Sequence, residues 1–145
     1  MIVQAPAGSG KTGAFGVSSI LRVDKSIDKV QVMVVCNTRE LCNQIYKVYS
    51  QIVKGTGIGL SNLADKDAKP SQINICVHGF LEKALTGKKK LDLTAIKTIV
   101  VDEADWFFKK DNFELLWKLK DYKNVQDANP QWILFSATYP QDDDK

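Results

Sequence analysis

The sequence contains little cysteine and little histidine. Its 145 residues include three cysteines, Cys36, Cys42 and Cys76, without a Cys-x-x-Cys pair, and a single histidine, His78. Disulfide frameworks and zinc sites need several such residues at short, recurring spacings. The sequence therefore excludes both, and we expect three buried or half-buried free thiols.

The sequence also lacks a long apolar run, an internal repeat and any low-complexity segment beyond the short acidic end at 142–145. A membrane-spanning helix needs roughly 20 consecutive apolar residues. A secretory signal begins with positive charge followed by an apolar stretch. Neither pattern occurs, so the sequence predicts a soluble intracellular protein, cytoplasmic or nuclear.

Positive charge exceeds negative charge only slightly in this sequence. Twenty Lys and Arg residues stand against 17 Asp and Glu, which gives a net charge of +3. Such a balance permits contact with nucleic acid but does not by itself predict it. With 44% hydrophobic residues, the chain can bury one core of ordinary size, so we expect a single domain over 1–145.

Short apolar stretches alternate with helical ones along the chain. This alternation is typical of an α/β fold, a parallel sheet flanked by helices on both faces. The stretch from Val30 to Val35 is almost continuously apolar, as expected for a strand covered on both sides. The expected strands are Ile2–Gln4, Val30–Val35, Gly59–Leu63, Ile73–Val77, Thr98–Val101 and Trp132–Phe135.

The clearest helices are expected at Thr38–Lys54 and Phe113–Leu119. In the first of them, apolar residues recur at helical spacing and predict the face that packs on the core. Asn37 followed by Glu40 also has the spacing of a capping box, which would start this helix. The residues of the predicted core face are Leu41, Ile45, Val48 and Ile52.

A glycine-rich segment, APAGSGKT, follows the first expected strand and begins at Ala5. Its backbone N–H groups can surround phosphates, because Gly8 and Gly10 leave room and a helix N-terminus follows. Lys11 can then reach the terminal phosphates, while the Thr12 hydroxyl can bind Mg²⁺. The residues expected to bind the nucleotide are Ala7, Gly8, Ser9, Gly10, Lys11 and Thr12.

Two further segments follow expected strands. Asp102-Glu103-Ala104-Asp105 comes directly after the apolar residues 99–101, and Ser136-Ala137-Thr138 comes after the apolar residues 132–135. A carboxylate at a strand end beside the phosphate loop can supply the second protein contact to Mg²⁺, and Asp102 is placed for that role. Together the three segments resemble the first RecA-like P-loop domain of the DEAD-box ATP-dependent RNA helicases.

The resemblance covers nearly the whole chain and implies an ATP-binding enzyme that uses Mg²⁺. It implies that Lys11 and Thr12 contact the phosphates and the metal, and that Asp102 holds the metal through water. Glu103 corresponds to the base that orients the attacking water. The remaining matching residues, which in the family link the ATP state to the grip on RNA, are Asp105, Ser136 and Thr138.

The RNA-binding segments match the family less completely. Residues 37–41, NTREL, carry Asn37 where the family has proline, and the resemblance places Thr38 and Arg39 against the RNA backbone. The family's Thr-Pro-Gly-Arg segment is replaced by residues 77–80, VHGF, which removes a hydroxyl and a guanidinium and leaves Gly79. No Gly-Gly pair occurs between residues 60 and 71, where the family usually has one. We therefore expect weakened RNA binding.

The resemblance also implies parts that lie outside these 145 residues. The family reads adenine with a segment upstream of the first strand, and a second RecA-like domain supplies arginine fingers and half of the RNA groove. We expect residues 1–145 to be the N-terminal domain, nearly inactive alone because such cations contribute about 10³- to 10⁵-fold to phosphoryl transfer. The spacing between Val23 and Gln44 is nearest to the mRNA-export subgroup, and protein regulators are expected as partners.

Other interpretations stay open at this stage. The altered residues 77–80 are also consistent with a degenerate RecA-like module that binds RNA or protein without turnover, and the phosphate loop with an ATPase of the DNA-helicase type. We expect His78 in a solvated loop, with a phosphate or 2′-OH contact as the alternative. Lys88–Lys90 are expected in a solvated loop, and residues 106–108, WFF, in helix packing, with a partner surface as the alternative.

Overall fold

The computed structural model describes residues 1–4, 10–109 and 112–137, and six strands in this part of the chain form one sheet. The strand order is β1-β6-β5-β2-β4-β3, and every neighbouring pair is parallel. Parallel strands need long crossover connections, which the intervening helices provide. The strands are β1 (Ile2–Gln4), β2 (Val32–Cys36), β3 (Leu60–Asn62), β4 (Ile73–Val77), β5 (Thr98–Val101) and β6 (Gln131–Ser136).

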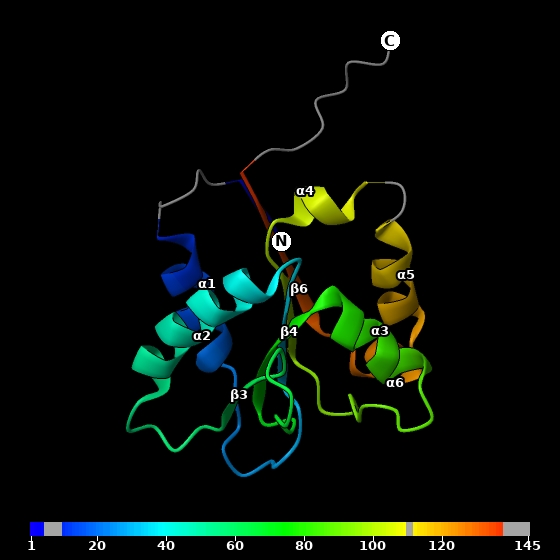
Figure 1. Cartoon of the computed structure of the whole chain (residues 1–145). Helices are drawn as coiled ribbons and strands as arrows, with labels where there is room; N and C mark the ends of the chain where they lie inside the picture. The colour runs from blue at the N-terminus through cyan, green and yellow to red at the C-terminus, as the bar shows by residue number, and fades with distance from the viewer. Residues whose placement is uncertain (5–9, 110–111, 138–145) are drawn as a thin grey trace.

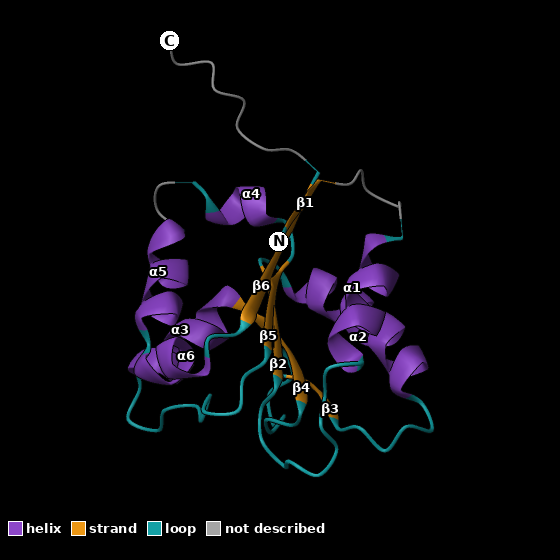
Figure 2. Ribbon diagram, turned by 180° about the vertical axis from the view of Figure 1, so that it is seen from behind, coloured by secondary structure: helices purple, strands orange, loops and turns teal. Residues whose placement is uncertain are grey.

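Helices cover both faces of this sheet (Figures 1 and 2). Helices α1 and α2 lie on one face, and the helices that follow β4 and β5 lie on the other (Figure 2). This arrangement confirms the predicted RecA-like α/β fold. The helices are α1 (Lys11–Ile20), α2 (Arg39–Val53), α3 (His78–Thr86), α4 (Ala104–Phe107), α5 (Phe113–Asp121) and α6 (Lys123–Ala128).

The position of strand β2 in the middle of the sheet explains why its sequence is continuously apolar. Val32 and Val34 pack into the core under α1 and α2, whereas Met33 and Val35 pack into the core on the opposite face. Successive side chains of a strand point to opposite faces. Because helices cover both faces, a strand in the middle of the sheet has no position left for a solvated side chain.

The predicted element bounds are close to the observed ones. Strands β1, β4 and β5 have the predicted ends. Strand β3 is one residue shorter than predicted at each end, and β6 is one residue longer at each end. Strand β2 begins two residues later than predicted, although Val30 and Gln31 are buried. Helix α2 lies within one residue of its predicted bounds at each end, and α5 runs two residues further.

The start of α2 corrects the capping prediction. The N-cap is Thr38, whose backbone is extended and whose hydroxyl oxygen accepts a 3.2 Å hydrogen bond from the N–H of Leu41. Thr38 thereby satisfies one of the free N–H groups at the helix start. The Asn37–Glu40 capping box is therefore wrong by one residue, and the Asn37 side chain makes a different contact, described below.

The core face of α2 is also rotated from the predicted one. Its deepest residues are Cys42, Ile45 and Tyr49, whereas the predicted Val48 is only half-buried. Tyr49 can be fully buried because its hydroxyl shares a 2.9 Å hydrogen bond with the Ser19 hydroxyl of α1. Burial raises the pKa of Tyr49, so the phenol stays neutral.

All three cysteines are free and buried, as predicted. Burial raises the pKa of the Cys76 thiol. A hydrogen bond with Cys42, together with burial, raises the pKa of Cys36. These thiols are therefore unreactive parts of the core.

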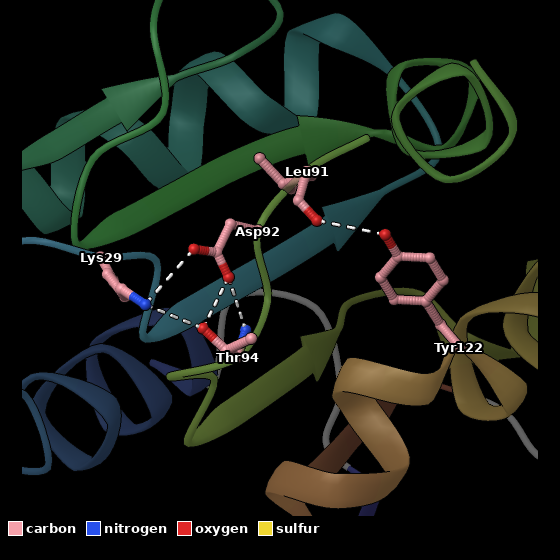
Figure 3. A network of polar contacts seen from close by, with 5 residues as sticks. All are labelled: Lys29, Leu91, Asp92, Thr94 and Tyr122. Atoms are coloured by element: carbon pink, nitrogen blue, oxygen red, sulfur yellow. Dashed lines mark hydrogen bonds and ion pairs between the residues drawn. The ribbon is translucent and has the colours of Figure 1, made fainter. Parts of the chain in front are cut away.

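Residues 87–97 connect α3 to β5 and include the exposed Lys88–Lys90, which confirms the predicted solvated loop. The loop is fastened at the amino-terminal end of the sheet (Figure 3). Lys29 lies 3.5 Å from the Asp92 carboxylate and donates to the Thr94 hydroxyl, and the Tyr122 hydroxyl donates to the Leu91 carbonyl. None of the helices in the described part of the chain is both long and apolar enough to cross a membrane.

Candidate nucleotide and RNA site

The predicted site residues gather at one edge of the sheet. Because every strand pair is parallel, the residues that follow β2, β4 and β5 and the end of β6 meet at the carboxyl-terminal edge. The chain leaves β1 through α1 and enters β2, which lies beyond β6 and β5 in the sheet (Figure 2). Open α/β sheets bind ligands at this edge, where the strand order reverses.

The described part of the phosphate loop ends in a glycine that the conformation requires. Gly10 is the N-cap of α1 with φ of 77°, in the left-handed region that favours glycine. Lys11 and Thr12 follow in the first turn of α1, and both are half-buried. Ala7, Gly8 and Ser9 lie outside the described residues, so their predicted role stays a prediction.

Lys11 reaches across the sheet edge to the acidic segment. Its Nζ lies 3.2 Å from Oδ1 of Asp102, whose side chain is fully buried, while the Lys11 side chain is 15% exposed. A buried carboxylate without such a partner would be strongly unfavourable. The ion pair therefore joins two residues that are 91 positions apart and that the sequence assigns to one phosphate and metal site.

The two carboxylate oxygens of Asp102 differ in their hydrogen-bond partners. Oδ1 takes both the Lys11 contact and a 2.9 Å hydrogen bond from the N–H of Glu103, whereas the buried Oδ2 has no hydrogen-bond partner among the described residues. Unpaired buried oxygens are rare because they cost stability. A carboxylate oxygen and the hydroxyl of Thr12, the residue that follows Lys11, are hard oxygen donors, which Mg²⁺ prefers, so the residues present fit this metal.

Glu103 is exposed at the end of β5 and has an unusual backbone. Its φ of 51° and ψ of 52° lie in the left-handed region, and it is the N-cap of α4. Non-glycine residues in this region are concentrated at functional sites. The Glu103 carboxylate accepts a 3.1 Å hydrogen bond from the side-chain amide of Asn37, a contact that the sequence did not reveal.

The predicted coupling residues are joined in the part that the structure describes. The Ser136 hydroxyl at the end of β6 donates a 2.7 Å hydrogen bond to the Asp105 carboxylate in α4. The bond connects the acidic segment to the last strand. Thr138, the third predicted member, lies outside the described residues.

Two predicted RNA-binding residues line one hollow of about 350 Å³ beside the ends of β3 and β4. Arg39, from the start of α2, and Gly79, from the start of α3, face it together with Lys66 and Lys83. A Cβ added to Gly79 would meet nothing within 4 Å, so a ligand backbone has room to approach. Thr38 is exposed next to Arg39. Sequence reasoning missed both lysines because neither belongs to a local motif.

His78 corrects a further prediction, because it does not lie in a solvated loop. It is the first residue of α3, is half-buried, and its ring lies 4.8 Å from that of Trp106. Its Nδ1 is buried without a hydrogen-bond partner among the described residues. Trp106 and Phe108 pack around the buried Phe107, which confirms the predicted helix packing of this aromatic run.

Comparison with known proteins supports this picture. A family model described as DEAD/DEAH box helicase matches residues 1–145. The chain is 35% identical over 153 residues to DEAD-box ATP-dependent RNA helicase 38 of Arabidopsis thaliana, covering 96% of this chain and 30% of that protein. It is 35% identical over 146 residues to ATP-dependent RNA helicase dbp5 of Schizosaccharomyces pombe, covering 97% of this chain and 28% of that protein.

Solved structures agree in fold. The structure of Saccharomyces cerevisiae Dbp5 bound to RNA and ADP BeF3 superposes with a TM-score of 0.79 at 28% identity, covering 96% of this chain and 36% of that one. The chain thus spans about 30% of the length of the curated relatives. With the family model matching all 145 residues, the chain belongs to the DEAD/DEAH box helicase family.

Proposed function

We propose that this chain is the nucleotide-binding RecA-like domain of an ATP-dependent RNA helicase. The observation that carries the proposal is the cluster of Lys11, Asp102 and Glu103 at the carboxyl-terminal edge of the sheet. Relatives over this region are named ATP-dependent RNA helicases. The sheet edge offers a cation for phosphates, oxygen donors for a metal and a carboxylate for an attacking water.

In the proposed mechanism Lys11 exchanges partners. In the structure it pairs with Asp102, and an arriving triphosphate offers the ammonium a stronger anionic partner. Thr12 and Asp102 would hold Mg²⁺, which neutralises phosphate charge when bound. Glu103 would orient the water that attacks the terminal phosphorus and would accept its proton, while the bond from that phosphorus to the bridging oxygen breaks and ADP leaves. This role needs an exposed carboxylate beside the phosphate site.

Asp105 and Ser136 carry the proposed coupling to RNA. Their hydrogen bond ties the residue two positions after Glu103 to the end of β6. A shift of the acidic segment on hydrolysis is therefore transmitted to residues 136 and 137 and, by the resemblance, to Thr138.

The RNA contact is proposed for the hollow lined by Arg39 and Gly79 and for the exposed Thr38, which precedes Arg39 in the chain. Lys66 and Lys83 add positive charge where Phe80 has replaced the family's arginine. Phosphate contacts of this kind fix position without reading sequence, so the domain should bind unrelated RNAs alike. The structure of yeast Dbp5 with RNA and ADP BeF3 supports the class of ligand.

Duplex unwinding is proposed for the whole protein, with a second RecA-like domain supplying the remaining cations and half of the groove. Adenine recognition is proposed for a segment upstream of β1. Protein regulators, the mRNA-export subgroup and a cytoplasmic or nuclear location stay predictions.

The decisive experiment measures ATP hydrolysis by the full-length protein with and without single-stranded RNA and single-stranded DNA. We expect hydrolysis that needs Mg²⁺ and rises with RNA. Stimulation by DNA alone would favour a DNA-helicase type, and ATP binding without hydrolysis in any condition would favour a degenerate module.

A further inference from the structure

We propose that Asn37 is a positioning residue for Glu103, the proposed base, and that its amide holds one oxygen of the Glu103 carboxylate so that the other faces the attacking water. The inference rests on the proposed function. It begins with the hydrogen bond of 3.1 Å from Nδ2 of Asn37 to Oε2 of Glu103.

Strand register brings the two residues together. Strands β2 and β5 are neighbours, and Val35 pairs with Val101. Asn37 and Glu103 each follow their paired valine by two residues, so they leave the sheet edge side by side. The N–H of Asp102 also donates to the Val35 carbonyl, at 3.1 Å, which continues the pairing up to this point.

The direction of the Asn37 amide is fixed by its partner. A carboxylate only accepts hydrogen bonds, so the NH₂ end must face Glu103. The amide oxygen is then left buried, with no hydrogen-bond partner among the described residues. An unsatisfied buried oxygen destabilises the fold. The Asn37 side chain therefore adopts the orientation that donates to Glu103 even though its own oxygen is left without a partner among the described residues.

The contact depends on asparagine at position 37. Proline, which the family carries at this position, has no side-chain donor. Glu103 is exposed and sits on a left-handed backbone, so packing does little to restrict its side chain. A hydrogen bond from a half-buried amide restricts it instead, and small misplacements of a catalytic group can cost large factors in rate.

The test compares variants of the full-length protein in RNA-stimulated ATP hydrolysis. Asn37→Leu removes the donor at similar size, and Asn37→Asp also adds a repelling charge. We expect kcat to fall about ten-fold in the first and further in the second, as for the loss of a hydrogen bond to a charged group. KM for ATP should change less than about two-fold, because an interaction that acts only on the base leaves substrate binding intact.

The matched control is Asn124→Asp on α6, which makes the same chemical change away from the site and should leave kcat unchanged. A second arm needs no activity. In Asn37→Asp combined with Glu103→Gln, donor and acceptor exchange places, so the melting temperature lost in Asn37→Asp should recover while hydrolysis stays as low as in Glu103→Gln alone.

An unchanged kcat in Asn37→Leu, or a melting temperature that the exchange does not recover, would overturn the proposal. Failure of the proposed function would look different, because the unaltered protein would then hydrolyse no ATP. The melting temperatures of the variants would still test the contact between Asn37 and Glu103.

Discussion

The two halves of the carboxyl-terminal edge have diverged differently from the family pattern. Around β5 and β6, the acidic segment and Ser136 keep the residues that the resemblance assigns to ATP and to coupling. Asp102 pairs with Lys11, and Asp105 accepts a hydrogen bond from Ser136. Around β2 and β4, Asn37, Val77, His78 and Phe80 replace the family's residues. His78 packs on Trp106, and Phe80 packs partly on the core while it also lines the hollow beside Arg39 and Gly79.

This difference suggests which function constrains each half. Phosphate and metal chemistry needs particular charges at fixed distances, so few substitutions are tolerated. A grip on the RNA backbone is the sum of several weak phosphate contacts, and cations at other positions can replace a lost one. We propose Lys66 and Lys83, which line the same hollow as Arg39 and Asp65, as such cations.

The largest effect should come from the ATP half. Glu103→Gln keeps the shape of the side chain but removes the carboxylate that accepts a proton, so hydrolysis by the full-length protein should fall by about 10²- to 10⁴-fold. ATP binding should persist, as measured by titration calorimetry. Hydrolysis at the original rate would assign the base to another carboxylate and remove the contrast between the halves.

Lys11→Ala should weaken nucleotide binding and should also lower the stability of the nucleotide-free protein. It removes the cation beside the phosphates and leaves the buried Asp102 without its partner. We expect weaker Mg²⁺-dependent ATP binding and a loss of about 3 kcal/mol in the free energy of unfolding, as for a broken buried pair. Urea unfolding measures this loss. Adding Asp102→Asn to Lys11→Ala should restore most of the stability without restoring nucleotide binding. If Lys11→Ala alone were as stable as the unaltered protein, the ion pair would contribute nothing to the fold.

On the RNA half, restoring the family residues should strengthen binding. Val77→Thr with Phe80→Arg regains a hydroxyl and a guanidinium, and we expect about ten-fold tighter binding of a short single-stranded RNA. The slope of log affinity against log salt should steepen by about 0.7 for the regained charge. Fluorescence anisotropy at several salt concentrations measures both.

The opposite variant on the same surface is Arg39→Ala, which should weaken binding by a similar factor across unrelated RNA sequences. Because Phe80 packs partly on the core, thermal unfolding of the restored variant is needed as a control. If neither variant changes RNA affinity, this hollow is not the RNA surface.

The smallest effect should lie at the amino-terminal end of the sheet, far from both halves. Hydrogen bonds from Thr94, with Lys29 nearby, hold the pKa of Asp92 below its ordinary value of 3.8. A lowered pKa contributes stability above the unfolded value that disappears as the pH falls through the folded one. Asp92→Asn should therefore cost less than about 1 kcal/mol near pH 6, since both side chains are more than half exposed and water screens them.

Urea unfolding of both proteins between pH 2 and pH 6 provides the check. The stability difference should shrink as the pH falls below about 3.8. A difference that stays constant over this range would mean that Asp92 acts through packing and not through its charge.

Local sequence determined much of this protein. The continuous apolar stretches of β2 and β5 encode buried strands because successive side chains point to opposite faces, and a strand covered on both faces needs an apolar residue at every position. The glycine-rich loop, the acidic segment and Ser136 are contiguous motifs whose chemistry is recognisable without a fold. The end of α2 could be predicted to within one residue, but its N-cap could not, since Asn37 and Thr38 are both good caps.

Only the tertiary structure decided which distant residues meet. Lys11 reaches Asp102, Asn37 reaches Glu103, and Arg39 shares a hollow with Lys83, because six parallel strands adopt one order and one register. Strand order is set by how helices pack on both faces, which no short segment encodes. His78 was mispredicted for the same reason: its partner Trp106 is 28 positions away and becomes a neighbour only when α3 and α4 pack on the same face.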